Sequence, residues 1–157
     1  MGKKQKNKFP NVPAANFRVS EGQSVYRSSI GVRAKNQDEL IRIVKKGLPV
    51  SSFEKLKDQI GISGKTLSEI INIVPRTLAR RKAEGRFQSN ESERLLRLAL
   101  LFDKAIMVIG DQESARHWFK TPKIALGGKS PLEYADSEIG AREVEDLLGR
   151  IEHGVFS

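Results

Sequence analysis

The sequence contains no cysteine among its 157 residues. Disulfide bridges, cysteine-ligated zinc, iron–sulfur clusters and thiol catalysis are therefore excluded for this chain. Histidine is almost as scarce. His117 and His153 are the only two, and neither has a second histidine or a carboxylate at the spacing of a zinc-binding helix. The sequence therefore predicts neither a metal site nor a cofactor.

Motifs for catalysis are also missing. The chain has no nucleophile elbow and no dinucleotide-binding glycine motif. Residues 64–66 (GKT) and 128–130 (GKS) imitate the end of a phosphate-binding loop, but the additional glycine that such a loop needs is replaced by Gln59 and Lys123. We therefore expect no enzymatic activity.

Long apolar runs are absent as well. Residues 1–24 hold four lysines and two prolines without an apolar core, so they predict a basic flexible tail rather than a secretory signal. The most apolar stretch, residues 95–109, is short for a membrane span and is crossed by Arg97 and Lys104. It predicts a buried helix, partly covered by a second copy of the chain. We expect a cytoplasmic protein with no membrane partner.

Positive charge is present in excess but is unevenly distributed. The net charge of +9 divides into +4 for residues 1–25, +8 for residues 26–87 and −3 for residues 88–157. A basic front joined to an acidic back predicts two different partners, with nucleic acid expected for the front. The predicted division is a tail (1–24), a DNA-binding domain (25–87) and a second domain (88–157).

The fold class predicted by the apolar spacing is all-α, with only a weak strand signal in residues 24–32. Capping boxes at Ser51 with Glu54 and at Asn90 with Glu93 predict two of the helix starts. Ser63, Pro75, Ser130 and Ser137 predict the starts of other helices.

Residues 63–84 have the pattern of a helix-turn-helix. Residues 63–71 supply a packing helix, Asn72-Ile73-Val74 a turn whose asparagine tolerates positive φ, and residues 75–84 a recognition helix. A repeat of this pattern allows an earlier alternative, in which residues 63–71 read the DNA. The later register is favoured because it places four basic residues on the reading helix, against a single lysine in the earlier one.

The candidate DNA contacts follow from this register. Arginine suits bidentate contacts to guanine, and threonine suits phosphate or a thymine methyl group. The candidates for base contact are Arg76, Thr77 and Arg80, and those for phosphate contact are Lys65, Arg81, Lys82 and Arg86.

Several motifs together resemble the Xre-type antitoxins of bacterial RES–Xre toxin–antitoxin systems, the Xre/MbcA/ParS family. They are residues 75–81 (PRTLARR), 92–95 (SERL), 118–122 (WFKTP), 125–132 (ALGGKSPL), 140–148 (GAREVEDLL) and 150–157 (RIEHGVFS). The match runs from about residue 36 to the end of the chain. The sequence departs from a typical helix-turn-helix at Val74, where serine or threonine would cap the recognition helix.

This resemblance implies an Xre/Cro-like helix-turn-helix domain followed by a helical domain that dimerises and binds a toxin. It implies a bacterial, cytoplasmic antitoxin that forms a homodimer within a larger toxin–antitoxin complex. The front would bind operator double-stranded DNA and repress its own operon. The back would neutralise a RES-domain toxin, an NAD-consuming enzyme, by covering the toxin's active site with the C-terminal segment.

The acidic end of the chain is suited to that role. Residues 137–157 carry five acids against Arg142 and Arg150, so they can be steered to a basic cleft. Val155 and Phe156 are apolar beyond the glycine that ends the last helix. The candidate toxin contacts are Arg142, Glu145, Asp146, Arg150, His153, Gly154, Val155, Phe156 and Ser157. The alternative function is a plain helix-turn-helix repressor whose acidic half only dimerises.

Overall fold

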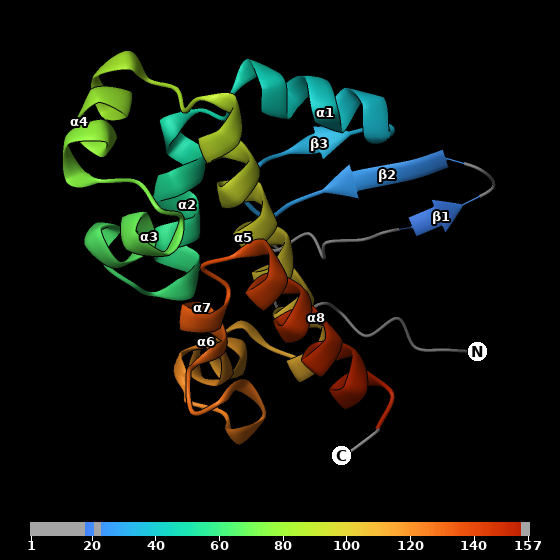
Figure 1. The fold of residues 1–157 in the computed structure, drawn as a ribbon. Helices are drawn as coiled ribbons and strands as arrows, with labels where there is room; N and C mark the ends of the chain where they lie inside the picture. The colour runs from blue at the N-terminus through green and yellow to red at the C-terminus, as the bar shows by residue number, and fades with distance from the viewer. Residues whose placement is uncertain (1–17, 21–22, 155–157) are drawn as a thin grey trace.

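The computed structural model describes residues 18–20 and 23–154, and these residues are mostly helical, as the sequence predicts (Figure 1). The helices of the first half are α1 (Gln37–Lys46), α2 (Val50–Ile60), α3 (Gly64–Ile70) and α4 (Pro75–Glu84). The long α5 (Ser89–Ile109) leads into α6 (Gln112–Lys120), the 3-10 turn η1 (Ile124–Leu126), α7 (Pro131–Tyr134) and α8 (Glu138–Glu152).

A small antiparallel sheet precedes the helices, with strand order β1 (Arg18–Ser20), β2 (Gln23–Arg27), β3 (Arg33–Ala34). Val19 pairs with Ser24, and Tyr26 pairs with Ala34. The weak strand signal therefore marks a real hairpin. The prediction of a flexible tail is wrong for residues 18–20 and 23–24, which form strand, whereas residues 1–17 and 21–22 lie outside the described residues.

Most helix starts agree with the predicted caps. Ser63, Ser130 and Ser137 each accept a hydrogen bond from a backbone N–H in the first turn of the following helix, and Pro75 occupies the first turn of α4. Both predicted N-terminal capping boxes are wrong. The N-cap of α2 is Pro49, and the capping box of α5 is formed by Gln88 with Glu91, two residues earlier than predicted.

The helix α5 lies at the centre of the molecule, with α2–α4 on one side of its first half and α6–α8 around its second half (Figure 1). Leu95, Phe102 and Ala105 are completely buried in it. The rings of Phe102 and Phe119 of α6 pack edge to face with centroids 5.4 Å apart. A single cluster of buried apolar side chains runs from Leu56 of α2 to Leu148 of α8, so α5 belongs to the core of both halves.

One carboxylate is buried in this core. Asp103 of α5 is 0% exposed and accepts hydrogen bonds from the Ser29 amide N–H (3.1 Å), the Ser28 hydroxyl (3.3 Å) and the Ser29 hydroxyl. The Ser29 hydroxyl also lies 2.7 Å from Oε1 of Gln59, so its single proton faces two acceptors. Burial raises the pKa of Asp103 to about 6, despite the opposing effect of these hydrogen bonds. When Asp103 is protonated, its carboxyl O–H donates to the Ser29 oxygen, and the Ser29 hydroxyl proton can then bond to Oε1 of Gln59.

This burial predicts a pH-dependent stability. Between about pH 4 and pH 6 the folded chain holds a proton that the unfolded chain has released, so the contribution of Asp103 to stability is present below about pH 4 and is lost as the pH rises through about 6. Asp103→Asn keeps one acceptor and gains N–H donors for the serine hydroxyls. As the pH rises from 4 to 7.5, the parent should lose stability that the variant keeps. The difference in free energy of unfolding, variant minus parent, should therefore increase by roughly 2–3 kcal/mol over this range.

Urea denaturation of both proteins at several pH values measures this difference. Asp136→Asn, at an exposed position, is the matched control and should follow the parent curve. A stability difference between Asp103→Asn and the parent that stays constant with pH would show that Asp103 is ionised throughout.

Candidate functional sites

The predicted helix-turn-helix has the expected backbone. Between α3 and α4, Asn72 is the only non-glycine residue with positive φ (58°) among the residues that the structure describes. Ile71 and Ile73 on either side are buried and fix the turn to the core. Arg94 of α5 reaches the turn, and its Nε donates to the carbonyl oxygen of Ile71 at 2.6 Å. No local pattern in the sequence indicates this contact of Arg94.

The outer face of α4 is free to contact a ligand. Arg76 and Arg80 are exposed, and within the described part of the chain neither takes part in a hydrogen bond or ion pair. Thr77 is half-buried between them. Val74 is the N-cap of α4, is 62% exposed and provides no side-chain cap, so the first N–H groups of α4 lack the usual serine or threonine oxygen.

Arg81 corrects one of the predicted contacts. It is only 5% exposed, and its guanidinium is committed to Glu91 of α5 and Glu84 of α4. This position disagrees with the predicted phosphate contact, because the guanidinium faces Glu91 and Glu84 instead of solvent. The prediction rested on the basic character of residues 75–84, and the sequence did not reveal that a buried carboxylate of α5 lies opposite Arg81.

The other predicted phosphate contacts lie around α4 at the surface. Lys65 is exposed on α3, and Lys82 is exposed with its Nζ 3.7 Å from Glu54 Oε1 and 5.9 Å from the centre of the Phe53 ring. Arg86 follows α4 and donates to the carbonyl oxygen of Gly47 at 2.5 Å. All three side chains are thus at the surface, but Lys82 contacts α2, Arg86 contacts Gly47 between α1 and α2, and only Lys65 lies on α3.

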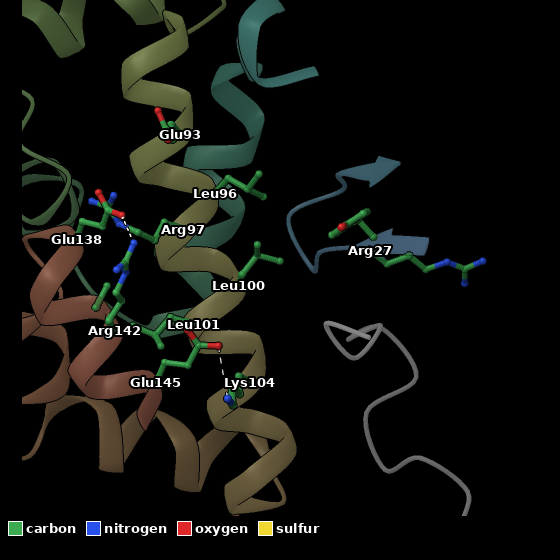
Figure 2. A pocket seen from close by; sticks show the side chains of 12 residues that line it. Arg27, Glu93, Leu96, Arg97, Leu100, Leu101, Lys104, Glu138, Arg142 and Glu145 are labelled. Atoms are coloured by element: carbon green, nitrogen blue, oxygen red, sulfur yellow. Dashed lines mark hydrogen bonds and ion pairs between the residues drawn. The ribbon is translucent and has the colours of Figure 1, made fainter. Parts of the chain in front are cut away.

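A second candidate surface lies where α8 packs on α5. Val144 and Leu148 are completely buried on the inner side of α8, and the outer side carries charged residues. Arg142 pairs with Glu138 at 2.7 Å, and Glu145 lies 3.5 Å from Lys104 of α5, as Figure 2 shows. The structure thus places the predicted toxin contacts of α8 along one edge of the helix.

Two hollows lie along this edge, and both are lined by Lys104 and Glu145. The polar hollow, of about 430 Å³, lies toward the end of α8 and is lined by Asp146, Arg150 and His153 as well. It therefore unites four of the predicted toxin contacts. Gly154 follows it with φ 67°, whereas Val155, Phe156 and Ser157 lie outside the described residues.

The apolar hollow, of about 480 Å³, lies between α5, the start of α8 and β2. Its floor is formed by Leu96, Leu100, Leu101 and Ala141. In Figure 2, Leu96 and Leu100 project from α5 toward the strand that carries Arg27, and Arg142 lies across from them on α8. Sequence periodicity identified α5 as buried, but gave no indication that this hollow would form.

The described residues, 18–20 and 23–154, contain no group of three or more side chains arranged to hold a metal ion. Within these ranges, no helix has the length and apolar character needed to cross a membrane.

Comparison with protein families gives two adjacent matches. Residues 39–100 match the antitoxin Xre-like helix-turn-helix domain, and residues 104–154 match the antitoxin Xre/MbcA/ParS C-terminal toxin-binding domain. The border between these matches falls inside α5.

Comparison with individual proteins agrees with these matches. The protein named Antitoxin Xre of Yersinia enterocolitica is 37% identical over 130 residues, which cover 82% of this chain and 88% of that protein. Antitoxin Xre of Photorhabdus laumondii is 33% identical over 131 residues, with the same coverage of both chains. A Sphingobium protein named Prs ADP-ribosylating antitoxin is 26% identical over 127 residues, which cover 74% of this chain and 80% of that one.

Among solved structures, a chain of the M. tuberculosis MbcT–MbcA toxin–antitoxin complex superposes with a TM-score of 0.51. At 22% identity it covers 67% of this chain and 94% of its own, and the likeness is one of fold.

Proposed function

The chain belongs to the family of Xre antitoxins, and from this premise we propose that it neutralises a RES-domain toxin and represses its own operon. The observation that carries the proposal is the division of α8 into two sides. Its inner side is held in the core by Val144 and Leu148, and its charged edge borders an open hollow of about 430 Å³. A rigid helix with an exposed charged edge presents a surface to a partner without refolding.

The toxin is proposed to dock on this edge. The proposed contacts on α8 and directly after it are Arg142, Glu145, Asp146, Arg150 and His153. The chain from Gly154 to Ser157 is proposed to cover the entrance of the toxin's active site. The acidic excess of residues 137–157 matches a basic cleft built for a phosphate-bearing dinucleotide such as NAD. The antitoxin itself needs no cofactor and is not an enzyme in this proposal, since the NAD chemistry belongs to the toxin.

Removal of residues 153–157 tests the role of the chain end. The truncated protein should keep its fold and its DNA binding, but should bind the toxin roughly 10–100-fold more weakly, because burial of a side chain such as Phe156 contributes about 1.5–3 kcal/mol. Calorimetric titration with a RES-domain toxin measures the affinity, and growth of co-expressing cells measures neutralisation.

A Gly-Ser segment of equal length in place of residues 153–157 separates side-chain contacts from chain length. If the truncated protein still inhibited the toxin fully, occlusion by the tail would be wrong. If the parent chain bound no RES-domain toxin at all, the alternative of a plain repressor would stand.

DNA binding is proposed for the outer face of α4. Arg76 and Arg80 are exposed and unpaired within the described residues, and Lys65, Lys82 and Arg86 are further basic residues at the surface of α3, α4 and the loop after α4. We assign base contacts to Arg76, Thr77 and Arg80, and phosphate contacts to the other three. The later of the two helix-turn-helix registers is favoured, because α4 exposes two unpaired arginines whereas α3 exposes one lysine.

Replacement of both Arg76 and Arg80 by Ala should abolish specific operator binding and leave toxin binding unchanged. Each lost bidentate contact costs about 1–3 kcal/mol, so the combined loss is on the order of 10²–10⁴-fold in affinity. Gel-shift titrations at several salt concentrations measure both affinity and its salt dependence. Replacement of Arg33 and Lys35, which are exposed before α1, by Ala is the charge-matched control. Sequence-specific binding retained by the Arg76/Arg80 variant would favour the earlier register, with α3 as the reading helix.

A homodimer is proposed to form over the apolar hollow. Its walls carry Glu93, Glu138 and Glu145 together with Arg27, Arg97, Arg142 and Lys104. Because both signs are present, two copies related by a two-fold axis can place acids opposite bases while their leucines meet. The complete assembly is proposed to be a larger toxin–antitoxin complex in the bacterial cytoplasm, with no membrane partner.

Leu100→Glu tests this interface. A charge at the half-buried Leu100 is tolerated in a monomer but would be desolvated between two copies, so the dimer dissociation constant should rise tenfold or more, since each 1.4 kcal/mol is tenfold. Sedimentation equilibrium measures the constant. Ile139→Glu, at a 78% exposed position outside the hollow, is the control and should remain dimeric. Equal dissociation constants for Leu100→Glu and the parent would place the interface elsewhere.

A further inference from the structure

The recognition helix α4 is attached to the rest of the molecule by few buried side chains. Of its ten residues, Leu78 and Arg81 alone are buried, and they lie three positions apart on one face. Leu78 contributes apolar contact, which is non-directional and leaves the rotation of the helix about its own axis loosely defined. Lys82 adds a further contact, because its Nζ lies 3.7 Å from Glu54 Oε1 of α2, but this ammonium is exposed and does not fix an angle. The rotation of α4 therefore depends mainly on what holds Arg81.

Arg81 is held by a directional contact from α5. Its Nε lies 2.8 and 3.0 Å from the two carboxylate oxygens of Glu91, and its Nη2 lies 2.9 Å from Oε1 of the same group. Its Nη1 also donates to Glu84 at 3.1 Å. A planar guanidinium that is paired in this way fixes angle as well as distance, which a lysine ammonium does not do.

Glu91 is itself fixed in position. Its Oε2 accepts from the backbone N–H of Gln88 at 2.9 Å, so the carboxylate is part of the capping box at the start of α5. Burial acts to raise the pKa of Glu91, but the hydrogen bonds from Arg81 and from the Gln88 amide outweigh it, and the net pKa is lowered. The partner of Arg81 is therefore an ionised carboxylate that is hydrogen-bonded to the backbone of α5's N-cap.

One turn further along α5, Arg94 contacts the turn that precedes α4. Its Nε donates to the carbonyl oxygen of Ile71, immediately before the turn at Asn72. The start of α5 thus contacts the turn through Arg94 and the body of α4 through Glu91.

We propose that the Glu91–Arg81 ion pair sets the rotation of α4 and thereby aims Arg76 and Arg80 at the base edges. Arg81 is a positioning residue for sequence readout and does not contact DNA. This inference rests on the proposed DNA binding by α4. Its functional consequence is specific: loss of the pair reduces discrimination between operator and unrelated DNA, while the phosphate contacts that give non-specific affinity remain.

Glu91→Gln tests the proposal in the full-length protein, because it removes the charge of the partner and leaves the positive charge of Arg81 in place. We expect the ratio of operator affinity to unrelated-DNA affinity to fall tenfold or more. The affinity for unrelated DNA and its salt dependence should stay within about twofold of the parent values. Unchanged discrimination would overturn the proposal.

A second pair of variants separates positioning from stability. Arg81→Met combined with Glu91→Leu replaces the buried ion pair by apolar contact, which commonly preserves stability but lacks the directional fork. This double variant should fold and should still discriminate poorly. Val144→Ala in α8 is the control for general destabilisation, and it should discriminate normally at temperatures where it is folded. If the double variant distinguished operator from unrelated DNA as well as the parent does, the role of Arg81 would be structural only, and the proposal would be wrong. A salt dependence lowered by about one phosphate contact in the double variant would instead make Arg81 a DNA contact, and would equally overturn the proposal.

A measurement without DNA distinguishes failure of this inference from failure of the proposed DNA binding. Residual dipolar couplings of the backbone amides report the orientation of α4 relative to α5. In the parent they should fit one fixed orientation, whereas in Glu91→Gln the α4 couplings should be reduced and those of α2 unchanged. Identical α4 couplings in both proteins would show that the ion pair does not orient the helix.

Discussion

Burial of α5 is the constraint on which the rest of the structure depends. The helix is apolar on most of its circumference, so it requires neighbours along its whole length, and α1, α2, α6 and α8 all pack against it. Because it is completely buried at Leu95 near one end and at Ala105 toward the other, the helix-turn-helix and the C-terminal helices share one core. The two matched families meet within this helix and not in a linker.

Four polar side chains of α5 join it to neighbouring elements. Glu91 holds α4, Arg94 holds the turn before it, Asp103 holds the loop at Ser28 and Ser29, and Lys104 meets α8 at Glu145. Each of these residues contacts a different neighbour, so the spacing of four polar positions along one rigid rod fixes where those neighbours sit. Apolar packing alone would permit sliding and rotation, whereas hydrogen bonds and ion pairs of defined geometry do not.

Local signals in the sequence were reliable where the chain acts on its immediate neighbours. Asn72 adopts the positive φ expected of the turn, and Ser63 and Ser137 cap the helices they precede. The cap of α5 was predicted two residues late, because Asn90 and Glu93 have the same spacing as the true pair, Gln88 and Glu91. Glu91 is the residue that forms the cap because it also contacts Arg81, ten residues earlier. A local pattern of capping residues does not include this contact. The β-hairpin was underestimated for a related reason, since its loop is stabilised by Asp103, about 75 residues away.

The sequence by itself determined the mostly helical fold, the helix-turn-helix, the acidic C-terminal segment and the family resemblance, because these depend on spacing, capping and composition along the chain. Tertiary structure alone decided which charges are available to partners. Arg76 and Arg81 are both basic residues of one helix, yet Arg76 is exposed and Arg81 is buried against Glu91. The difference arises because the environment of a charge is set by the residues that folding brings opposite it, and here that residue lies on another helix.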